Sequence, residues 1–279
     1  MASADEIADE LRTRIRNGDL RPGDRLPSMA GLAEAYGVNR QTARQALIVL
    51  KDEGLVEYRG GRNGTFVRER PTERMVRSRV MERDELGYYS GPDVQHWRAI
   101  TPTDVDREAH VPGDIAAILG VEPGSRAAVR RRLNGDPNIP VRRQLTDSWL
   151  HPDAVAAVPV IAGDSGRGGI YDRLEEWAGA ALVWDEESTA ATPSPAEAAA
   201  LLLPTGVPLL RVIRRTIVKA PPTGGGPLVA EVNDIRMSGE LFSVRHPLGR
   251  GRSARWPVAP ATGDFYAPPP PSDEPDDEL

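Results

Sequence analysis

The chain has 279 residues, a formal net charge of −6 and a sequence pI of about 5.4, and it contains no cysteine. This length suits two ordinary domains. The missing cysteines exclude disulfides and thiolate metal sites, and the 4 scattered histidines suggest no other metal set, so we expect no metal and no cofactor. No signal peptide is recognisable, and no apolar run approaches the roughly 18 residues of a membrane span. We therefore expect a soluble, cytoplasmic protein that does not contact membranes.

Residues 4–17 have the pattern of an amphipathic helix. Ile7, Leu11 and Ile15 fall on one face at helical spacing. Ser3 can cap the first turn, and Gly18 follows the last turn. We expect this helix to pack behind the two helices that follow it.

Residues 26–67 predict two short helices, a tight turn and a β-hairpin. Ser28 can cap the first helix, and Gly37 ends it in a conformation that glycine adopts easily. Asn39 can cap the second helix, which Gly54 ends. This order of elements is that of a winged helix-turn-helix, a module that places its second helix in the major groove of DNA.

The second of these helices has two chemically different faces. At roughly 100° per residue, its apolar residues fall in one arc, which would pack on the domain: Ala43, Ala46, Leu47 and Leu50. The opposite arc carries Arg40, Gln41, Arg44, Gln45 and Ile48. Guanidinium and amide groups suit paired hydrogen bonds with guanine and adenine edges. Arginines on a helix are also common on any solvated face, so the order and spacing of the whole motif carry the argument.

The hairpin would have strands near residues 55–58 and 65–67. Its tip contains Arg59, Gly61 and Arg62, and the two arginines can reach phosphates or the minor groove. A glycine-rich tip by itself is equally typical of a simple turn.

Nearly all of residues 4–68 resembles the GntR family of bacterial transcription regulators. The matching pieces are Gly18–Ser28, Leu32-Ala33, Gly37-Val38, Arg40, Thr42, Ala43-Arg44, Ala46-Leu47, Gly54–Val56 and Gly64–Val67. The resemblance implies that Arg40 and Arg44 contact bases or phosphates and that the wing tip around Gly61 enters the minor groove. The DNA-contacting residues expected together are Ser28, Asn39, Arg40, Gln41, Thr42, Arg44, Gln45, Arg59, Gly61 and Arg62.

The chain departs from the family at one position that matters for DNA. The family usually has Glu-Arg after the serine, and that arginine often contacts DNA. Met29 and Ala30 stand here instead. We therefore expect this contact to be absent and the operator or its affinity to differ from the family norm.

Four parts of the chain are expected in total. Residues 1–70 would form the winged helix-turn-helix, and residues 71–97, which are polar and arginine-rich, would be a solvated linker or a segment whose arginines follow DNA phosphates. Residues 98–246 would form a second domain. Residues 247–279 would be a basic stretch followed by a disordered, proline-rich acidic tail.

The second domain mixes strands and helices. Strands are predicted at residues 105–109, 127–133, 141–149, 183–189, 209–219 and 228–237, and helices at 114–119, 170–178 and 194–203. This part resembles the UTRA domain, the effector-sensing half of the HutC branch of GntR regulators. The matching pieces are Leu119–Val121, Pro123-Gly124, Arg130–Leu133, Ile139–Val141, Ile170–Leu174, Ala196–Leu210 and Glu231. The resemblance implies an α+β protein whose second domain is chorismate-lyase-like, with an antiparallel sheet, a small-molecule site and the dimer contact.

Arg130 and Arg132 alternate onto one face of their strand, and such a pair suits a carboxylate or a phosphate. The resemblance adds Gln144, Tyr171 and Glu231 as effector-binding residues. The family often has a serine just before the Ile-Tyr pair, where this chain has Gly169, so one hydroxyl contact is expected to be missing. Alternatively, Arg130, Arg132 and Glu231 form surface ion pairs only.

The sequence thus predicts a homodimeric regulator, most simply a repressor, that binds an inverted repeat in double-stranded DNA and answers to a small molecule. The alternative is a regulator whose second domain only dimerises or responds to a protein. An enzyme is not expected, because the segment around Ser165 lacks the nucleophile-elbow pattern and no glycine-rich phosphate loop precedes a helix.

Overall fold

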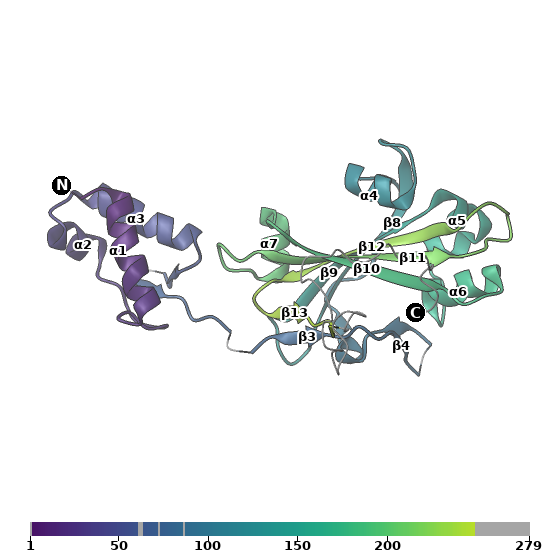
Figure 1. Ribbon diagram of the computed structural model, residues 1–279, viewed down its shortest axis with the longest axis horizontal. Coiled ribbons are helices and arrows are strands. Elements are labelled where there is room, and N and C mark those ends of the chain that lie inside the picture. Colours follow the sequence, from purple (N-terminus) through teal and green to yellow (C-terminus); the bar gives the residue numbers. More distant parts are fainter. Residues whose placement is uncertain (1, 61–63, 72, 86, 249–279) are drawn as a thin grey trace, which may run out of the picture. The chain divides into compact units, whose positions relative to one another are not determined.

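The computed structural model describes residues 2–60, 64–71, 73–85 and 87–248. Residues 1–244 form one unit and Arg245–Leu279 another. From residue 249 onward the second unit lies outside the described residues, and with it most of the expected basic stretch and the whole tail. The first unit contains a small helical domain and a larger domain built on a sheet (Figure 1). Among the described helices, none has the length and apolarity to cross a bilayer.

The N-terminal domain is a winged helix-turn-helix, as predicted. Its elements are α1 (Ala4–Asn17), α2 (Met29–Ala35), α3 (Arg40–Asp52), β1 (Val56–Tyr58) and β2 (Thr65–Val67). The two strands pair antiparallel, and Arg25 bridges to Phe66 as a third edge. Ile7, Leu11 and Leu50 are fully buried in the core between α1, α3 and the hairpin, so the apolar faces read from the sequence do meet.

Each helix of this domain begins at a polar cap, which explains why the helices start where they do. The Ser3 hydroxyl accepts from the backbone of Glu6, and the Glu6 carboxylate accepts from the Ser3 backbone. The Ser28 hydroxyl accepts from the N–H of Gly31 at 3.1 Å. These contacts satisfy N–H groups that have no partner inside the helix.

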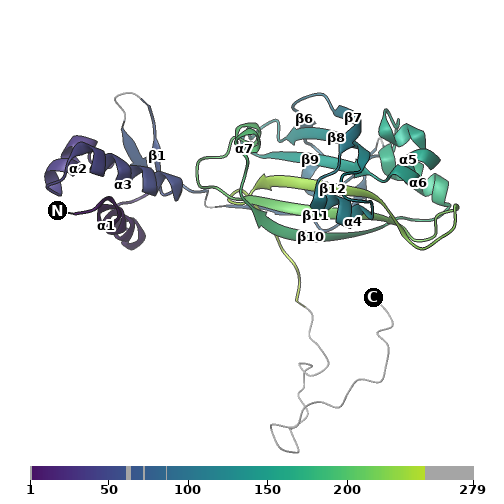
Figure 2. The ribbon, with the colours of Figure 1, turned by 90° about the horizontal axis from the view of Figure 1, so that it is seen from above.

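The second domain is organised on a seven-stranded antiparallel sheet in the order β10-β11-β12-β9-β8-β6, with β7 also paired to β8. Its strands are β6 (Arg98–Ala99), β7 (Asp104–His110), β8 (Arg126–Gly135), β9 (Arg143–Leu150), β10 (Val183–Ala191), β11 (Leu209–Val218) and β12 (Leu228–Ser238). Figure 2 shows the long strands side by side. The strands predicted from alternation are all present, and the antiparallel sheet expected from the resemblance is confirmed.

Helices cover the two faces of the sheet differently. They are α4 (Gly113–Leu119), α5 (Pro152–Ala157), α6 (Gly169–Ala178) and α7 (Pro195–Leu201), with the 3-10 helices η1 (Pro92–Val94) and η2 (Pro159–Ala162). Helix α4 packs on one face, against Trp149 and Val232. Helices α5, α6 and η2 pack with Leu150 and Ala230, which alternate onto the opposite face.

Residues 75–97, which we call the strap, differ from the solvated linker expected for 71–97. They contain β3 (Met75–Arg77), β4 (Glu82–Arg83), β5 (Tyr89–Ser90) and η1. Strand β3 pairs in parallel with β13 (Phe242–Val244), and β4 pairs with β5 as a hairpin. Figure 1 shows β3 and β4 on the side of the sheet away from α4. Strands of two or three residues are too short to give a periodic signal, which is why the sequence did not predict them.

The arginines of the strap are bound by acids of the same chain. Arg77 pairs with Asp93 at 2.8 Å, and Arg79 pairs with Glu186 at 2.6 Å. Arg83 pairs with a carboxylate of α6, that of Asp172. The expectation that arginines of this segment track DNA phosphates therefore does not describe these three, because their charges are compensated within the protein.

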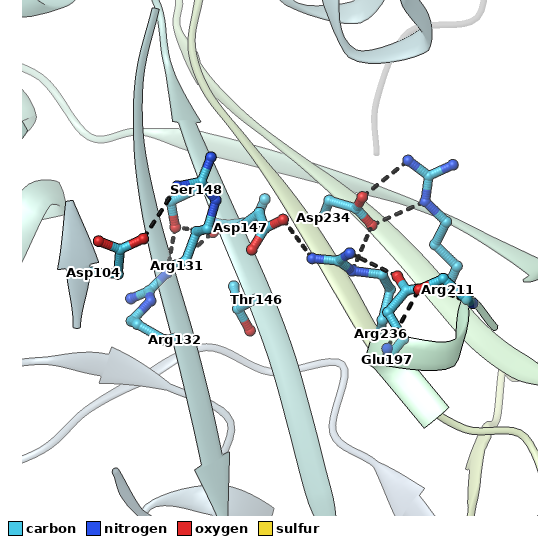
Figure 3. A network of polar contacts seen from close by, with 12 residues as sticks. Asp104, Arg131, Arg132, Thr146, Asp147, Ser148, Glu197, Arg211, Asp234 and Arg236 are labelled. Carbon is cyan, nitrogen blue, oxygen red and sulfur yellow. Dashed lines mark hydrogen bonds and ion pairs between the residues drawn. The ribbon is translucent and has the colours of Figure 1, made fainter. Parts of the chain in front are cut away.

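A network of ion pairs crosses the sheet beside α4 (Figure 3). Arg236 on β12 lies between Asp147 on β9, at 2.5 Å, and Glu197 on α7, at 2.7 Å. Arg211 on β11 joins Asp234, at 2.9 Å, to Asp114 on α4, at 2.8 Å. These pairs fix α4 and α7 to the sheet on this face.

Candidate DNA interface and ligand pocket

The face of α3 that the sequence assigned to DNA is exposed. Arg40, Gln41, Arg44 and Gln45 are all solvent-exposed, and their side chains form no hydrogen bond or ion pair with any residue that the structure describes. Two guanidinium groups and two amides are therefore available on one face of the helix. Burial of these side chains would have contradicted the predicted orientation of the helix.

The cap of α3 is built from two further predicted residues. Asn39 Oδ1 accepts from the backbone N–H of Thr42 at 2.8 Å and from its hydroxyl at 3.1 Å. Thr42 is half-buried, and Asn39 is exposed. Ser28 is exposed at the start of α2. These three residues fix helix ends, and a contact with DNA would be in addition to that role.

The wing is only partly described. Gly61 and Arg62, both predicted to contact DNA, lie outside the described residues. Arg59 is exposed, with its Nε donating to Glu57 at 2.6 Å and its guanidinium 4.7 Å from the ring centre of Phe66. A phosphate contact by Arg59 would have to compete with Glu57.

A pocket of about 270 Å³ opens on the sheet face that the strap covers. Strands β8, β9, β11 and β12 form its floor, the start of α6 forms one wall, and the strap forms another. All five residues predicted to bind an effector line it: Arg130, Arg132, Gln144, Tyr171 and Glu231. Residues distant in sequence are brought together because alternation on neighbouring strands places them on one face.

Arg130 and Arg132 give the pocket an excess of positive charge. Arg130 Nη1 donates to the carbonyl of Ile161 at 3.2 Å and to Ser165 Oγ at 3.4 Å. Arg132 Nη2 donates to Ser148 Oγ and, at 3.3 Å, to Asn233 Oδ1. Within the described part of the chain neither forms an ion pair, and the Nε of each is buried without a hydrogen-bond partner. The expected alternative, surface ion pairs involving these two arginines, is not what the structure shows.

The electrostatics of this pair favour an anion. Burial lowers the pKa of Arg130, and the charge of Arg132 beside it lowers it further. Two like charges in a partly dehydrated site repel each other, and the charge of Glu231 offsets this only in part, so a bound anion would be stabilised. A carboxylate or phosphate could accept paired hydrogen bonds from both guanidinium groups.

Glu231 and Tyr171 form the polar end of the pocket floor. Glu231 is 1% exposed, and its Oε2 accepts from the Thr216 hydroxyl at 2.9 Å. The Tyr171 hydroxyl accepts from Asn233 Nδ2 at 3.1 Å. Burial, and then the nearby charge of Glu231, raise the pKa of Tyr171 to about 12. The tyrosine therefore stays protonated, and Glu231, which supplies the one carboxylate among the described lining residues, can accept from a hydroxyl or amine of a ligand.

Several lining residues were not predicted from the sequence. They are Arg77, Tyr88, Tyr89, Ser90 and Trp97 of the strap, with Ser165, Arg214 and Asn233. Arg77 Nη1 donates to Gln144 Oε1, and the Gln144 amide donates to Thr146 at 2.8 Å. The one signal that could have located the strap residues is the unusual run Tyr88-Tyr89 and Trp97 in an otherwise polar segment, since aromatic residues are seldom left in a solvated linker.

Comparison with known proteins identifies the N-terminal part of the chain. Residues 3–67 match the family model described as bacterial regulatory proteins of the gntR family. These residues form a GntR-family DNA-binding domain. The chain is also 29% identical over 225 residues to an uncharacterised HTH-type transcriptional regulator of Streptomyces coelicolor, a match that covers 76% of this chain and 81% of that protein.

Two further likenesses extend the comparison beyond residues 3–67. The HTH-type transcriptional repressor NagR of Bacillus subtilis is 34% identical over 136 residues, which is 47% of this chain and 52% of NagR. A solved structure assigned as a GntR-family transcriptional regulator has 28% identity and a TM-score of 0.57, covering 90% of this chain and 99% of that one. The similarity to this solved structure therefore extends over both the GntR domain and the antiparallel-sheet domain.

Proposed function

We propose that the chain is a transcription repressor that binds an inverted-repeat operator as a homodimer and leaves it when a small anion occupies the second domain. The observation that carries the DNA-binding part is the exposed face of α3, where Arg40, Gln41, Arg44 and Gln45 have no partner among the described residues. The name of the B. subtilis relative, a repressor, supports repression as the direction of control.

The spacing of these residues suits base recognition. Arg40 and Arg44 lie one helical turn apart, as do Gln41 and Gln45, so each pair points along one line of the helix. Arginine can donate twice to guanine, and glutamine can pair with adenine, in the major groove. Two copies of α3 related by a two-fold axis would read half-sites about 10 base pairs apart.

The ligand part rests on the pocket. A volume of about 270 Å³ is near the lower end for small-molecule sites, which favours a compact metabolite. Arg130 and Arg132 supply two cations that have no acidic partner among the described residues, which favours a carboxylate or phosphate. A second domain that only dimerised or bound a protein would have no need of two half-buried, unpaired cations.

Operator selection tests the DNA-binding part. Fragments of genomic DNA retained by the protein should share an inverted repeat. Arg44→Ala should weaken binding to that repeat by about 10- to 100-fold, since a bidentate base contact is worth about 1–3 kcal/mol. Arg16→Ala is the matched control, because it removes an exposed arginine from α1. Equal affinities of the two variants would overturn the role of α3.

A thermal-shift screen of small acids and phosphates tests the ligand part. Arg132→Gln should abolish the stabilisation by any hit, whereas Arg131→Gln should keep it. Arg131 is the next residue on β8, but it faces the other side of the sheet and pairs with Asp104 at 3.1 Å. A hit that binds both variants equally would place the ligand elsewhere.

A further inference from the structure

The β4–β5 hairpin of the strap holds Tyr88 in a fixed place. The Tyr88 N–H donates to Asp84 Oδ1 at 2.8 Å, and the Tyr88 carbonyl accepts from the Asp84 N–H at 2.9 Å. Glu82 pairs with Ser90 across the hairpin. With both backbone groups of Tyr88 bound, the direction in which its side chain leaves the hairpin is determined.

This hairpin is docked on the first turn of α6, at the wall of the pocket. Arg83 binds the carboxylate of Asp172 on α6. A Cβ placed on Gly87 would lie 3.3 Å from the Cα of Gly168, so hairpin and helix approach through two glycines. The strap therefore contacts the pocket wall and does not merely pass over it.

The Tyr88 ring lies on Gly169. A Cβ placed on Gly169 would be 3.2 Å from Cδ1 and 3.5 Å from Cε1 of Tyr88, and Gly169 has φ +70°. Glycine gives the pocket no side chain at this position, and the space beside it is filled by the phenol ring. The side chain that lines the pocket wall at this point, that of Tyr88, therefore belongs to the strap and not to α6.

The Tyr88 side chain belongs to the wall of the charged pocket. Tyr88 and Arg130 both line it, and Tyr88 is near enough to Arg130 to act on its charge. Tyr88 is 42% exposed, and its hydroxyl forms no hydrogen bond with the described residues. A polar group at the rim of the pocket, beside an unpaired cation, is suited to contact whatever anion binds there.

We propose that Tyr88 is an effector-contacting residue whose hydroxyl donates to an anion held by Arg130 and Arg132, and that this contact ties ligand binding to the position of the strap. The inference rests on the proposed function, because it needs the anion site. It goes beyond that function by placing one ligand contact on the segment that connects the GntR domain to the sheet. A ligand that binds one strap position better than another shifts the equilibrium between them.

The test uses three probes with the same six-carbon framework: glucose, gluconate and glucose 6-phosphate. Binding to the full-length protein is measured by calorimetry, and release of the selected operator by fluorescence anisotropy. Tyr88→Phe should weaken the binding of the anionic probes by about tenfold, as expected for one hydrogen bond to a charged group. The probe concentration for half-release of DNA should rise by about the same factor. Glucose should not bind, which separates an anion site from a sugar site.

Ser78→Ala is the matched control. It removes a hydroxyl from the same strap at a residue outside the pocket lining, and that hydroxyl is engaged by the backbone of Val80, accepting from its N–H at 3.0 Å and donating to its carbonyl at 3.2 Å. Anion binding that is lost in Arg132→Gln but unchanged in Tyr88→Phe would overturn the inference and leave the proposed function standing. If no anionic probe binds while operator binding is intact, the effector part of the proposed function fails, and this inference fails with it.

Discussion

Arg12 binds Glu53 through two parallel hydrogen bonds, with Nε donating to Oε2 at 2.8 Å and Nη2 donating to Oε1 at 2.5 Å. Arg12 lies on α1, and Glu53 is the residue at which α3 ends. The pair joins the first helix to the end of α3 that is remote from the Asn39 cap. A fork-shaped pair of this kind fixes orientation as well as distance.

Glu53→Gln should lower the free energy of unfolding by about 1 kcal/mol or less at neutral pH, because even well-formed exposed pairs contribute little. Hydrogen bonds from Arg12 hold the pKa of Glu53 below its ordinary value. The stabilisation that the Arg12–Glu53 pair provides is therefore complete above the pKa of roughly 4.3 that Glu53 has in the unfolded chain. It is lost as the pH falls through the lower pKa that Glu53 has in the folded protein. Urea titrations near neutral pH and near pH 3, with Glu34→Gln as control, would measure it. If Glu53→Gln still lowered the free energy of unfolding near pH 3, the loss could not come from the ionised Arg12–Glu53 pair.

Asn39→Ala should destabilise the GntR domain by about 1 kcal/mol, since it removes the acceptor that caps α3. Asn39→Asp keeps an acceptor at the same place and should retain stability. It should nevertheless weaken operator binding, because it adds a negative charge at the end of α3 that faces DNA in the proposed complex. Thermal unfolding and operator titration of the two variants separate the capping role from the DNA role. Full operator affinity in Asn39→Asp would argue against the proposed docking of this helix end.

Arg236 is enclosed by acids, with its side chain 15% exposed. Arg236→Met should destabilise the second domain by about 3–5 kcal/mol at neutral pH, because it leaves Asp147 without its partner and removes one of the two cations beside Asp234, 3.7 Å away. Burial already raises the pKa of Asp147. A carboxyl with a raised folded pKa opposes folding above that pKa, so the loss should shrink as pH falls and Asp147 takes up a proton. Denaturant titrations of Arg236→Met and of Arg236→Met/Asp147→Asn would check this; equal stability of the two would contradict it.

Gly169→Ala should be more destabilising than Gly179→Ala, although both glycines have positive φ, at +70° and +63°. Each substitution carries a backbone penalty of about 1 kcal/mol. At Gly179, the C-cap of the same helix, a Cβ meets no described atom within 4 Å, whereas at Gly169 it meets Tyr88. The excess should disappear when both glycine variants are compared in a Tyr88→Ala background. If Gly169→Ala is still the more destabilising of the two in the Tyr88→Ala background, the Tyr88 ring is not the cause of the difference.

The sequence predicted the long elements well and the short ones poorly. Helix α3 and strands β8 and β12 extend over many residues, so their alternation is clear and their ends carry recognisable caps and turns. The connection between the strands predicted at 127–133 and 141–149 is shifted by about two residues in the structure, because β8 runs to Gly135 and β9 begins only at Arg143. Boundaries of this kind depend on cross-strand contacts that local patterns do not contain.

The pocket was predicted in part for a similar reason. Arg130 and Arg132 stood out because two arginines alternate on one strand. Arg214 and Asn233 face the same pocket, but their pattern is that of ordinary sheet residues until the register of β11 and β12 is known. Tyr88 was not predicted, because the polar, arginine-rich composition of residues 71–97 indicated a linker despite its aromatic residues. Its position depends on the hairpin meeting α6, a contact between distant parts of the chain.

Phe242–Val244 forms the strand beside Met75–Arg77, so the last strand of the second domain also secures the peptide that leaves the wing. The backbone N–H of Met75 donates to the carbonyl of Leu241 at 2.8 Å. Trypsin cuts after arginine, and Arg74, Arg77, Arg79 and Arg83 all lie in or beside this peptide. A protein shortened to residue 241 should be nicked there within minutes under conditions that leave a protein shortened to residue 248 whole. Cleavage of both proteins at the same rate would show that β13 does not protect this peptide. If β13 does protect it, affinity tags and fusion partners at this end of the chain should be attached beyond Val244.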